Sequence, residues 1–335
     1  MISEQQLSEL GGSGLFVSPI GLGMAALGRP GYINIGHAND LNRDYRVGAM
    51  EAHSHRVLDA AWDSGVRYFD AARSYGRAEQ FLGSWLIARQ IAPDQVTVGS
   101  KWGYTYTAGW QVQAQKHEVK EHSLPVLQRQ IGESRALLGD YLDLYQIHSA
   151  TLESGVLANQ AVLGELAHLK EKGLRIGLSL SGPKQAETLR KALEVEVAGR
   201  LLFDTVQATW NLLEPSAGAT LQEAYQAGLG VIVKEALANG RLTPRNDRAD
   251  FADRRQLLEQ VATEVGVGID GLALAAALAQ PWAGVVLSGA AIVEHLHENL
   301  LALSIHWNDD LAERLRPIVE PPETYWAIRS NLDWN

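Results

Sequence analysis

Short apolar runs of strand length recur along the chain, and a helical pattern of 10 to 20 residues follows each of them. This alternation is typical of successive strand–helix units whose strands form a parallel sheet. The candidate strands end near eight positions: Met24, Asp70, Lys101, His148, Ser179, Gln207, Lys234 and Ser288. A unit of about 30 residues, the usual size of a strand–crossover–strand element, accounts for most of the spacing, with three insertions. Eight parallel units favour an α/β fold in the form of a closed (β/α)8 barrel.

Glycine follows three of the predicted helices close to the start of the next strand. Helices are predicted over residues 49–64, 159–171, 217–226, 251–265 and 269–280. Gly65, Gly173 and Gly228 come within two residues of the first three helix ends. Because glycine accepts the left-handed conformation that commonly ends a helix, this rhythm supports the barrel.

The connecting segments predict a plugged barrel with long loops at its C-terminal face. Leu10-Gly-Gly-Ser-Gly-Leu-Phe-Val places turn residues between two short apolar stretches, which predicts a β-hairpin that plugs the closed end. Residues 29–46, rich in Gly, Asn and Asp, predict a surface loop, and residues 241–250 predict a second loop.

The C-terminal tail, from about residue 317 to residue 335, is predicted to be mostly irregular because Pro317, Pro321 and Pro322 interrupt it. Tyr325 and Trp326 are expected to anchor this tail. No linker or low-complexity stretch divides the chain, so residues 1–335 are expected to form a single barrel domain.

The composition narrows the class of protein. The chain of 335 residues is 46% hydrophobic and 20% charged, which is the profile of a globular protein. A net charge of −10 argues against binding to nucleic acid or to anionic membrane lipid. The absence of cysteine excludes disulfides, thiolate zinc sites and cysteine nucleophiles. With no signal sequence and no long apolar run, we expect a cytoplasmic protein that acts on small molecules.

Three motifs resemble known sites but lack a necessary element. Gly21-Leu-Gly-Met-Ala-Ala matches a dinucleotide fingerprint, yet a loop rich in Gly and Pro follows it instead of a helix. Gly177-Leu-Ser-Leu-Ser lacks the last glycine of a nucleophile elbow. His117-Glu-Val-Lys-Glu-His spaces its histidines by five residues, which places them on different faces of a predicted helix start. The sequence therefore predicts no Rossmann domain, no serine hydrolase and no metal site.

Polar residues at three consecutive strand ends are the candidate chemistry, because active sites of such barrels lie at the C-terminal ends of the strands. Asp70, Lys101 and His148 stand there, and the loop after Asp70 carries Tyr75. Hydride delivery to a carbonyl leaves an alkoxide that needs a proton. An ammonium group beside a tyrosine lowers the pKa of the phenol, and a carboxylate keeps the ammonium charged and oriented. A histidine in the same place can donate a hydrogen bond to the substrate oxygen.

These motifs resemble those of the aldo-keto reductases over about residues 10–302. Phe69-Asp-Ala-Ala-Arg-Ser-Tyr-Gly76, followed by Glu79-Gln-Phe-Leu-Gly83, is similar to a conserved block of that family. Ser100-Lys101 and Leu144-Tyr-Gln-Ile-His148 are similar to its lysine and histidine strands. The resemblance implies a nicotinamide cofactor bound without a Rossmann domain and reduction of carbonyl groups. It implies that Tyr75 is the proton donor, that Lys101 and Asp70 tune it, and that His148 orients the carbonyl.

The resemblance also implies a set of cofactor-binding positions. These are Gly23, Met24, Asp70, Ser179, Gln207, Lys234, Leu237, Gly240, Leu242, Arg245, Gly289, His295, Glu298 and Asn299. Ser179 and Gln207 match contacts to the nicotinamide carboxamide, and Arg245 matches a basic position near the pyrophosphate. Glu298 and Asn299 match positions that bind adenine.

Two departures from the family pattern bear on the cofactor. Lys234 stands where relatives often have an aromatic side chain that stacks on the nicotinamide ring. Ala291 and His295 stand where many relatives have Arg or Lys, the residues best suited to a 2′-phosphate. The family pattern therefore implies NADP(H), while the local residues leave NAD(H) open.

Aromatic residues just beyond the strand ends are candidates for a substrate pocket. These are Trp102, Tyr104 and Trp210, together with Tyr32 in the first insertion, and Trp326 in the tail is a further candidate. Aromatic walls suit sugar faces and aryl carbonyls equally.

The leading hypothesis is an NAD(P)(H)-dependent oxidoreductase that interconverts an aldehyde, ketone or sugar with its alcohol or lactone. One alternative is a Schiff-base aldolase-type barrel that uses Lys101 or Lys234 as the amine. Another is a catalytically weak, cofactor-binding regulatory subunit. Self-association is left open by the sequence.

Overall fold

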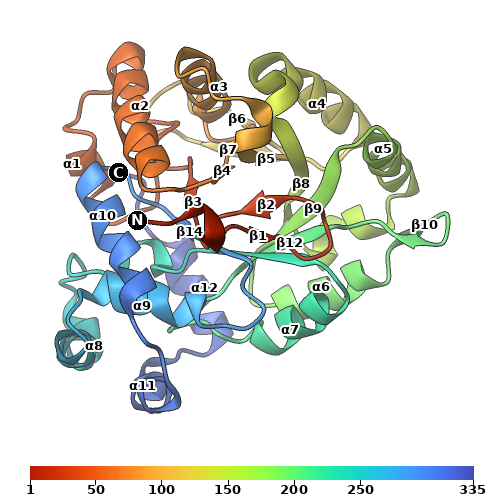
Figure 1. Ribbon diagram of the computed structural model, residues 1–335. Coiled ribbons are helices and arrows are strands. Elements are labelled where there is room, and N and C mark those ends of the chain that lie inside the picture. Colours follow the sequence, from red (N-terminus) through yellow and green to blue (C-terminus); the bar gives the residue numbers. More distant parts are fainter.

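The computed structural model describes residues 1–335 with the exception of the side chain of Glu4. Its centre is a closed barrel of parallel strands in the order β12-β13-β14-β3-β4-β5-β8-β9, as predicted (Figure 1). The strands are β3 (Ile20–Gly23), β4 (Tyr68–Asp70), β5 (Thr97–Trp102), β8 (Leu142–Ala150), β9 (Arg175–Leu180), β12 (Thr205–Thr209), β13 (Gly230–Lys234) and β14 (Val285–Ser288). Each of the predicted strand ends lies within two residues of the observed one.

The helices surround the barrel (Figure 1). They are α2 (Val47–Asp63), α3 (Ala78–Ala88), α4 (Leu124–Leu138), α5 (Gln160–Glu171), α6 (Gln185–Leu193), α7 (Gly218–Gln226), α8 (Ala252–Glu264), α9 (Ile269–Leu278) and α10 (Val293–Leu300). Shorter or additional elements are the helices α1 (His37–Asp40), α11 (Asp309–Leu315) and α12 (Pro322–Ser330), and the hairpin strands β1 (Ser8–Glu9), β2 (Phe16–Val17), β6 (Tyr104–Tyr106), β7 (Glu118–Lys120), β10 (Glu196–Val197) and β11 (Arg200–Leu201). The 3-10 turns are η1 (Glu4–Gln6), η2 (Pro93–Gln95), η3 (Gly139–Tyr141), η4 (Leu152–Ser154), η5 (Val156–Ala158), η6 (Ala238–Gly240), η7 (Ala249–Phe251), η8 (Leu301–Ser304) and η9 (Arg316–Ile318).

Glycine ends helix α2 as the sequence predicts. Gly65 has a φ of 90°, and a Cβ at this position would lie 2.2 Å from the carbonyl oxygen of Ile2. Other residues would meet both a strained backbone and a clash there. The turn into β4, and with it the position of Asp70 at the strand end, therefore depends on this glycine.

The N-terminal hairpin closes one end of the barrel, which confirms the predicted plug. Strands β1 and β2 pair in an antiparallel manner, and they lie across the barrel opening that faces the viewer in Figure 1. Leu10 and Val17 are fully buried against Tyr68, Leu144 and Ile232 of the barrel strands. The other end of the barrel, where the strands finish, is left for the candidate site.

Two expectations about loops are wrong in part. Residues 29–46 are not a plain surface loop, because Arg29, His37 and Asp40 are buried and the short helix α1 lies within the segment. The tail is not mostly irregular, because α12 occupies Pro322–Ser330. Proline is tolerated in the first turn of a helix, where its missing N–H has no intrahelical partner, so the prolines begin this helix instead of preventing it. Tyr325 and Trp326 are buried anchors, as expected.

The segment from His117 to His122 is also different from its prediction. It contains strand β7, which pairs with β6 in a hairpin beside the barrel mouth, and not the start of a helix. The local pattern alternates polar and apolar residues over too few positions to separate the two structures. Helix α4 begins only at Leu124.

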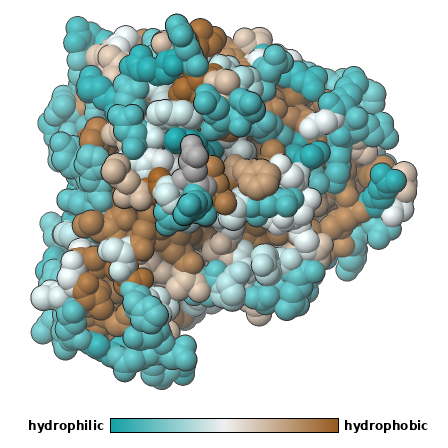
Figure 2. Space-filling model, viewed as in Figure 1, coloured by the Kyte–Doolittle hydropathy of each residue, from teal (hydrophilic) through white to brown (hydrophobic). Residues whose placement is uncertain are grey.

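Figure 2 shows the plugged face with hydrophilic residues around its rim and hydrophobic residues gathered near α8 and α9. Among the described residues, no single helix has the length and apolar composition to cross a membrane, and one sharply bent pair, Ala249–Glu264 with Ile269–Leu278, meets those two criteria.

Candidate active site

The carboxylate of Asp70, at the end of β4, is the centre of a buried hydrogen-bond network. Its Oδ2 accepts from Lys101 Nζ of β5 in a direct ion pair. Its Oδ1 accepts from Gln207 Nε2 at 2.9 Å, from Tyr68 Oη at 3.2 Å and from Gln146 Nε2 at 3.3 Å. Such a fully occupied carboxylate has one fixed orientation, and so does the ammonium group paired with it.

Lys101 links this network to Tyr75. The lysine side chain is fully buried, and its Nζ donates to the carbonyl oxygen of Ala71 at 2.9 Å and to Tyr75 Oη at 3.4 Å. The three donor directions of the ammonium group are thus directed at Asp70, Ala71 and Tyr75. The sequence reasoning predicted this juxtaposition from the three strand ends.

The Tyr75 phenol is protonated in the ligand-free protein. Burial raises its pKa well above the ordinary value, and the negative charge of Asp70 raises it further. The guanidinium of Arg29, 5.3 Å from the ring centre, acts in the opposite direction. We expected Lys101 to lower this pKa below that of free tyrosine, and burial outweighs any such effect here. The group therefore carries a proton that it can give to an acceptor.

His148 lies beside Tyr75 at the end of β8. The rings of Tyr75 and His148 meet edge to face with centres 5.5 Å apart, and the ring of Tyr104 also meets the imidazole edge to face, with centres 4.9 Å apart. Burial lowers the pKa of His148 well below its ordinary range, and Lys101, Lys234 and Arg29 lower it further. The ring is therefore neutral. Its Nδ1 lies 3.4 Å from Ser74 Oγ, so when Nδ1 accepts from this hydroxyl, Nε2 carries the proton and can donate it.

Ser179 holds the backbone next to His148. The register between β8 and β9 shifts between Ile147 and Ala150, and Ser149 has a φ of 53°. Ser179 Oγ accepts the backbone N–H of Ser149 at 2.8 Å. An irregularity of this kind re-aims the neighbouring side chains, so Ser179 positions His148 from behind the wall of the site.

These groups open on a cavity of about 630 Å³ at the C-terminal end of the barrel. Most of the residues proposed from the resemblance line it: Gly23, Asp70, Tyr75, His148, Gln207, Lys234, Leu237, Gly240, Arg245, Gly289, His295, Glu298 and Asn299. Of the expected substrate-pocket residues, Tyr32 and Tyr104 also line it. This volume is within the usual range for small-molecule and cofactor sites, roughly 300–1,000 Å³.

Six of the expected binding residues do not line the cavity. Met24 and Leu242 are fully buried in the hydrophobic core, and Ser179 acts on the backbone as described. Trp102 and Trp210 are wrong as pocket residues, because Trp102 packs on His122 and Trp210 packs on Trp282. Trp102 is the last residue of β5 and Trp210 directly follows β12, and such a position does not determine whether the side chain points into the barrel mouth. Trp326, in the tail, also packs outside the lining.

Several lining residues were not identified from the sequence. These are Arg29, Glu118, Glu235, Arg329 and Trp334. Arg29 pairs with Glu118 at 3.1 Å, and Arg329 holds both carboxylate oxygens of Glu235 through Nε at 2.9 and 3.1 Å. Arg29 and Glu118 come from insertions, and Arg329 and Trp334 come from the tail, where the local sequence carries no periodic signal that would place them at the mouth. Glu235 directly follows β13.

Lys234 is the lining cation with the weakest carboxylate contact. Its Nζ donates to Thr209 Oγ1 at 2.7 Å and lies 3.8 Å from Glu235, whose oxygens Arg329 already occupies. Burial lowers the pKa of Lys234 from 10.5 to about 8. Lys234 therefore offers a hydrogen-bond donor at the position where relatives often have an aromatic side chain.

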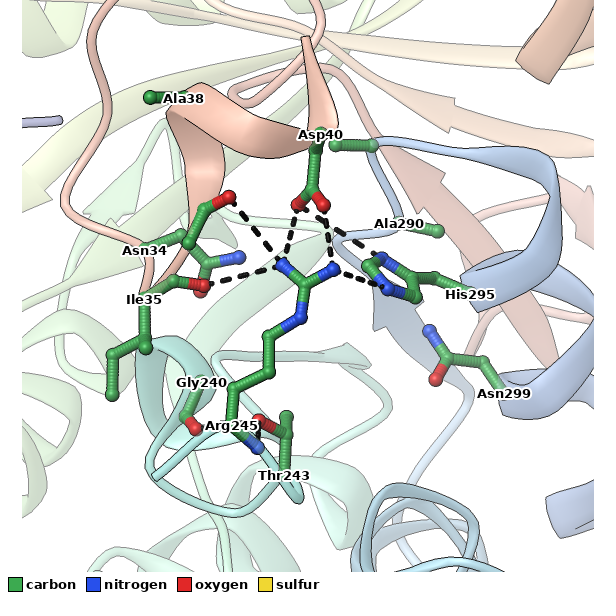
Figure 3. Close-up of polar contacts among 12 residues, drawn as sticks. Asn34, Ile35, Ala38, Asp40, Gly240, Thr243, Arg245, Ala290, His295 and Asn299 are labelled. Atoms are coloured by element: carbon green, nitrogen blue, oxygen red, sulfur yellow. Dashed lines mark hydrogen bonds and ion pairs between the residues drawn. The ribbon is translucent and has the colours of Figure 1, made fainter. Parts of the chain in front are cut away.

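The other end of the cavity carries Arg245, His295 and Asn299, drawn in Figure 3. Among the described residues, the buried Oδ1 atoms of Asn239 and Asn299 have no hydrogen-bond partner, although both residues line the cavity. Gly240 and Gly289 line it without side chains. Unsatisfied acceptors and bare backbone fit the polar donors and the phosphates of a dinucleotide.

Comparison with known proteins decides the family. The family model for the aldo/keto reductases matches residues 19–320, which is most of the chain. The chain belongs to the aldo/keto reductase family. Members of the family generally use nicotinamide cofactors and act on small-molecule carbonyl compounds, and this chain is accordingly an oxidoreductase.

Curated relatives of this reductase are distant but extend over nearly its whole length. It is 26% identical to the uncharacterized oxidoreductase YqkF of Bacillus subtilis, over 88% of this chain and 90% of that protein. It is 25% identical to pyridoxal 4-dehydrogenase of Microbacterium luteolum, over 87% and 91% of the two chains. It is 24% identical to L-glyceraldehyde 3-phosphate reductase of Escherichia coli O157:H7, over 98% and 96%.

A solved relative has the same fold. The holo form of aldo-keto reductase AKR11C1 from Bacillus halodurans superposes with a TM-score of 0.74 at 20% identity, covering 94% of this chain and 97% of that one. Among the described residues of this chain, no group of three or more His, Asp or Glu side chains is arranged to hold a metal ion.

Proposed function

We propose that this reductase interconverts an aldehyde, ketone or sugar with its alcohol or lactone by hydride transfer, using NAD(P)(H), with Tyr75 as general acid and, in the reverse direction, general base. The observation that carries the proposal is the direct contact of Tyr75 with Lys101 and His148 at the wall of the cavity. Two relatives named for pyridoxal and for L-glyceraldehyde 3-phosphate support a small carbonyl or sugar as substrate.

A bound reduced nicotinamide supplies the hydride. The chain's own residues supply the proton and the orientation. As negative charge develops on the carbonyl oxygen, the neutral Tyr75 phenol gives up its proton to that oxygen. The Lys101 ammonium, 3.4 Å from Tyr75 Oη, then stabilises the phenolate that remains.

His148 orients the carbonyl in this scheme. Its neutral ring donates a hydrogen bond from Nε2 to the same oxygen that accepts the Tyr75 proton. Because burial and three nearby cations keep His148 uncharged, it does not compete with Tyr75 as the proton source. Asp70 holds the ammonium of Lys101 and does not touch the substrate.

The lining residues that the family resemblance assigns to the adenosine end, Arg245, His295, Glu298 and Asn299, would hold that end of a dinucleotide if its nicotinamide ring lay beside Tyr75. The resemblance favours NADP(H). No Arg or Lys stands at position 291 or 295 for a 2′-phosphate, so NAD(H) is the other candidate.

The Schiff-base alternative is restricted to Lys234. Lys101 is fully buried and committed to Asp70, so it cannot attack a carbonyl. Lys234 lines the cavity, and its pKa of about 8 leaves part of it as a free amine at neutral pH.

Titration with NADH and with NADPH, followed by quenching of tryptophan fluorescence, tests the proposal. We expect saturable binding of at least one dinucleotide. If the folded protein binds neither, and borohydride traps a carbonyl compound on Lys234, the redox proposal is wrong.

A further inference from the structure

At the end of the cavity assigned to the adenosine, Arg245 forms an ion pair with Asp40. Arg245 donates from Nη1 to Asp40 Oδ2 at 2.9 Å and from Nη2 to Asp40 Oδ1 at 2.6 Å (Figure 3). The Asp40 side chain is only 3% exposed, whereas that of Arg245 is 34% exposed. A bidentate pair of this kind uses the donors with which an arginine would otherwise hold a phosphate.

His295 contacts both members of this ion pair. Its Nε2 lies 2.8 Å from Arg245 Nη2. Its Nδ1 lies 4.0 Å from Asp40 Oδ2. Asp40 therefore offsets the positive charge of Arg245.

The position of Asp40 is built into the segment that the sequence predicted as a surface loop. Gly36, with a φ of 80°, begins helix α1, and the carbonyl oxygens of Ile35 and Gly36 lie 3.5 Å from Arg245 Nη1. The pair also lies between two hollows. Arg245 lines both the main cavity and a second hollow of about 620 Å³, and Asp40 lines the second hollow. A group attached to the adenosine ribose would meet this pair.

We propose that Asp40 makes this end of the cavity selective for a dinucleotide with free ribose hydroxyls, NAD(H), over one with a 2′-phosphate, NADP(H). The inference rests on the proposed function, in which the cavity holds a dinucleotide with its adenosine end here. The Asp40 carboxylate repels a phosphate and withholds Arg245 from it. Uncharged ribose hydroxyls are not repelled and do not need the guanidinium.

Calorimetric titration of wild-type protein, Asp40→Asn and Asp44→Asn with NADH and with NADPH tests the proposal. Asp44, in the same segment, pairs with Arg46 at the surface and serves as the matched control. Adenosine 2′,5′-bisphosphate and AMP are titrated as fragments without a nicotinamide ring. All of these readouts are binding constants and need no turnover.

We expect the wild type to bind NADH at least about tenfold more tightly than NADPH, the scale of one charge-assisted hydrogen bond. Asp40→Asn should shift this ratio at least tenfold toward NADPH and should raise the affinity for the bisphosphate, while Asp44→Asn should leave the ratio unchanged. Equal or tighter binding of NADPH by the wild type would overturn the proposal, as would an unchanged ratio in Asp40→Asn. If Asp40→Asn does not fold, the wild-type ratio decides. Failure of the folded wild type to bind either dinucleotide would instead refute the proposed function.

Discussion

At the scale of single residues, the proposed reaction depends on the hydroxyl of Tyr75. Tyr75 Oη lies 3.4 Å from a lysine that is already fixed by Asp70, and burial keeps the phenol protonated. A carbonyl oxygen that becomes an alkoxide needs a proton, and a neutral phenol can give one. The nearby ammonium group then stabilises the phenolate that remains.

Replacement of Tyr75 by phenylalanine should therefore remove most turnover and little binding. We expect kcat for carbonyl reduction to fall by at least about a hundredfold, because the general acid is lost. The dissociation constant of the dinucleotide should change by less than about threefold, since the ring remains. Steady-state kinetics and fluorescence titration measure the two quantities.

Tyr225→Phe is the matched control, because Tyr225 is exposed on α7 and loses the same hydroxyl. Its kcat should equal that of the wild type. If Tyr75→Phe were as active as Tyr225→Phe, another group would have to supply the proton.

At the scale of elements, an ion pair ties helix α12 to the end of β13. Arg329 on this helix holds Glu235, which follows β13 and has a φ of 56°. Both groups are largely buried, and the favourable contact keeps the pKa of Glu235 near 2. Nothing in the tail sequence, with its three prolines, indicated a helix with this role.

Arg329→Met should lower the free energy of unfolding by about 3 kcal/mol, because Glu235 is left with Lys234 at 3.8 Å as its remaining cation. Arg316→Met, which breaks an exposed pair with Glu313, should cost less than about 1 kcal/mol. Urea unfolding of both variants measures the difference. Equal losses would show that the Arg329 pair does not dock the helix.

Asp143, near the start of strand β8, makes the free energy of unfolding depend on pH. Burial raises the pKa of Asp143 from 3.8 to about 7, although its Oδ2 accepts the N–H of Val98 at 2.8 Å. The folded state therefore binds more protons than the unfolded state between about pH 4 and pH 7. The stabilisation from this proton is complete below that window and is lost as the pH rises through 7.

Asp143→Asn removes the titration and keeps an acceptor oxygen. We expect the variant to be more stable than the wild type by about 1 kcal/mol or more at pH 8, and the advantage to shrink toward pH 5. Denaturant unfolding at the two pH values checks this. An advantage that is the same at both pH values would contradict the assigned pKa.

At the scale of the whole molecule, the barrel and the four groups at its mouth were predictable because they follow from repeated patterns. Apolar runs recur in every unit, glycine ends three of the predicted helices, and parallel strands bring Asp70, Lys101 and His148 to one end. Arg29, Asp40 and Arg329 were not predictable in this way. Their positions depend on contacts between segments far apart in the sequence, and Trp102 and Trp210 show that a strand end alone does not fix a side chain's direction.

The most direct test of the central claim is a single turnover with bound dinucleotide. Wild-type protein is loaded with the reduced dinucleotide that it binds more tightly and mixed with a panel of aldehydes, ketones and sugars, while the absorbance of the dihydronicotinamide is followed. We expect the absorbance to disappear with at least one carbonyl compound and to persist without one. A dinucleotide that stays bound and reduced with every carbonyl compound would contradict the account and indicate a cofactor-binding regulatory subunit.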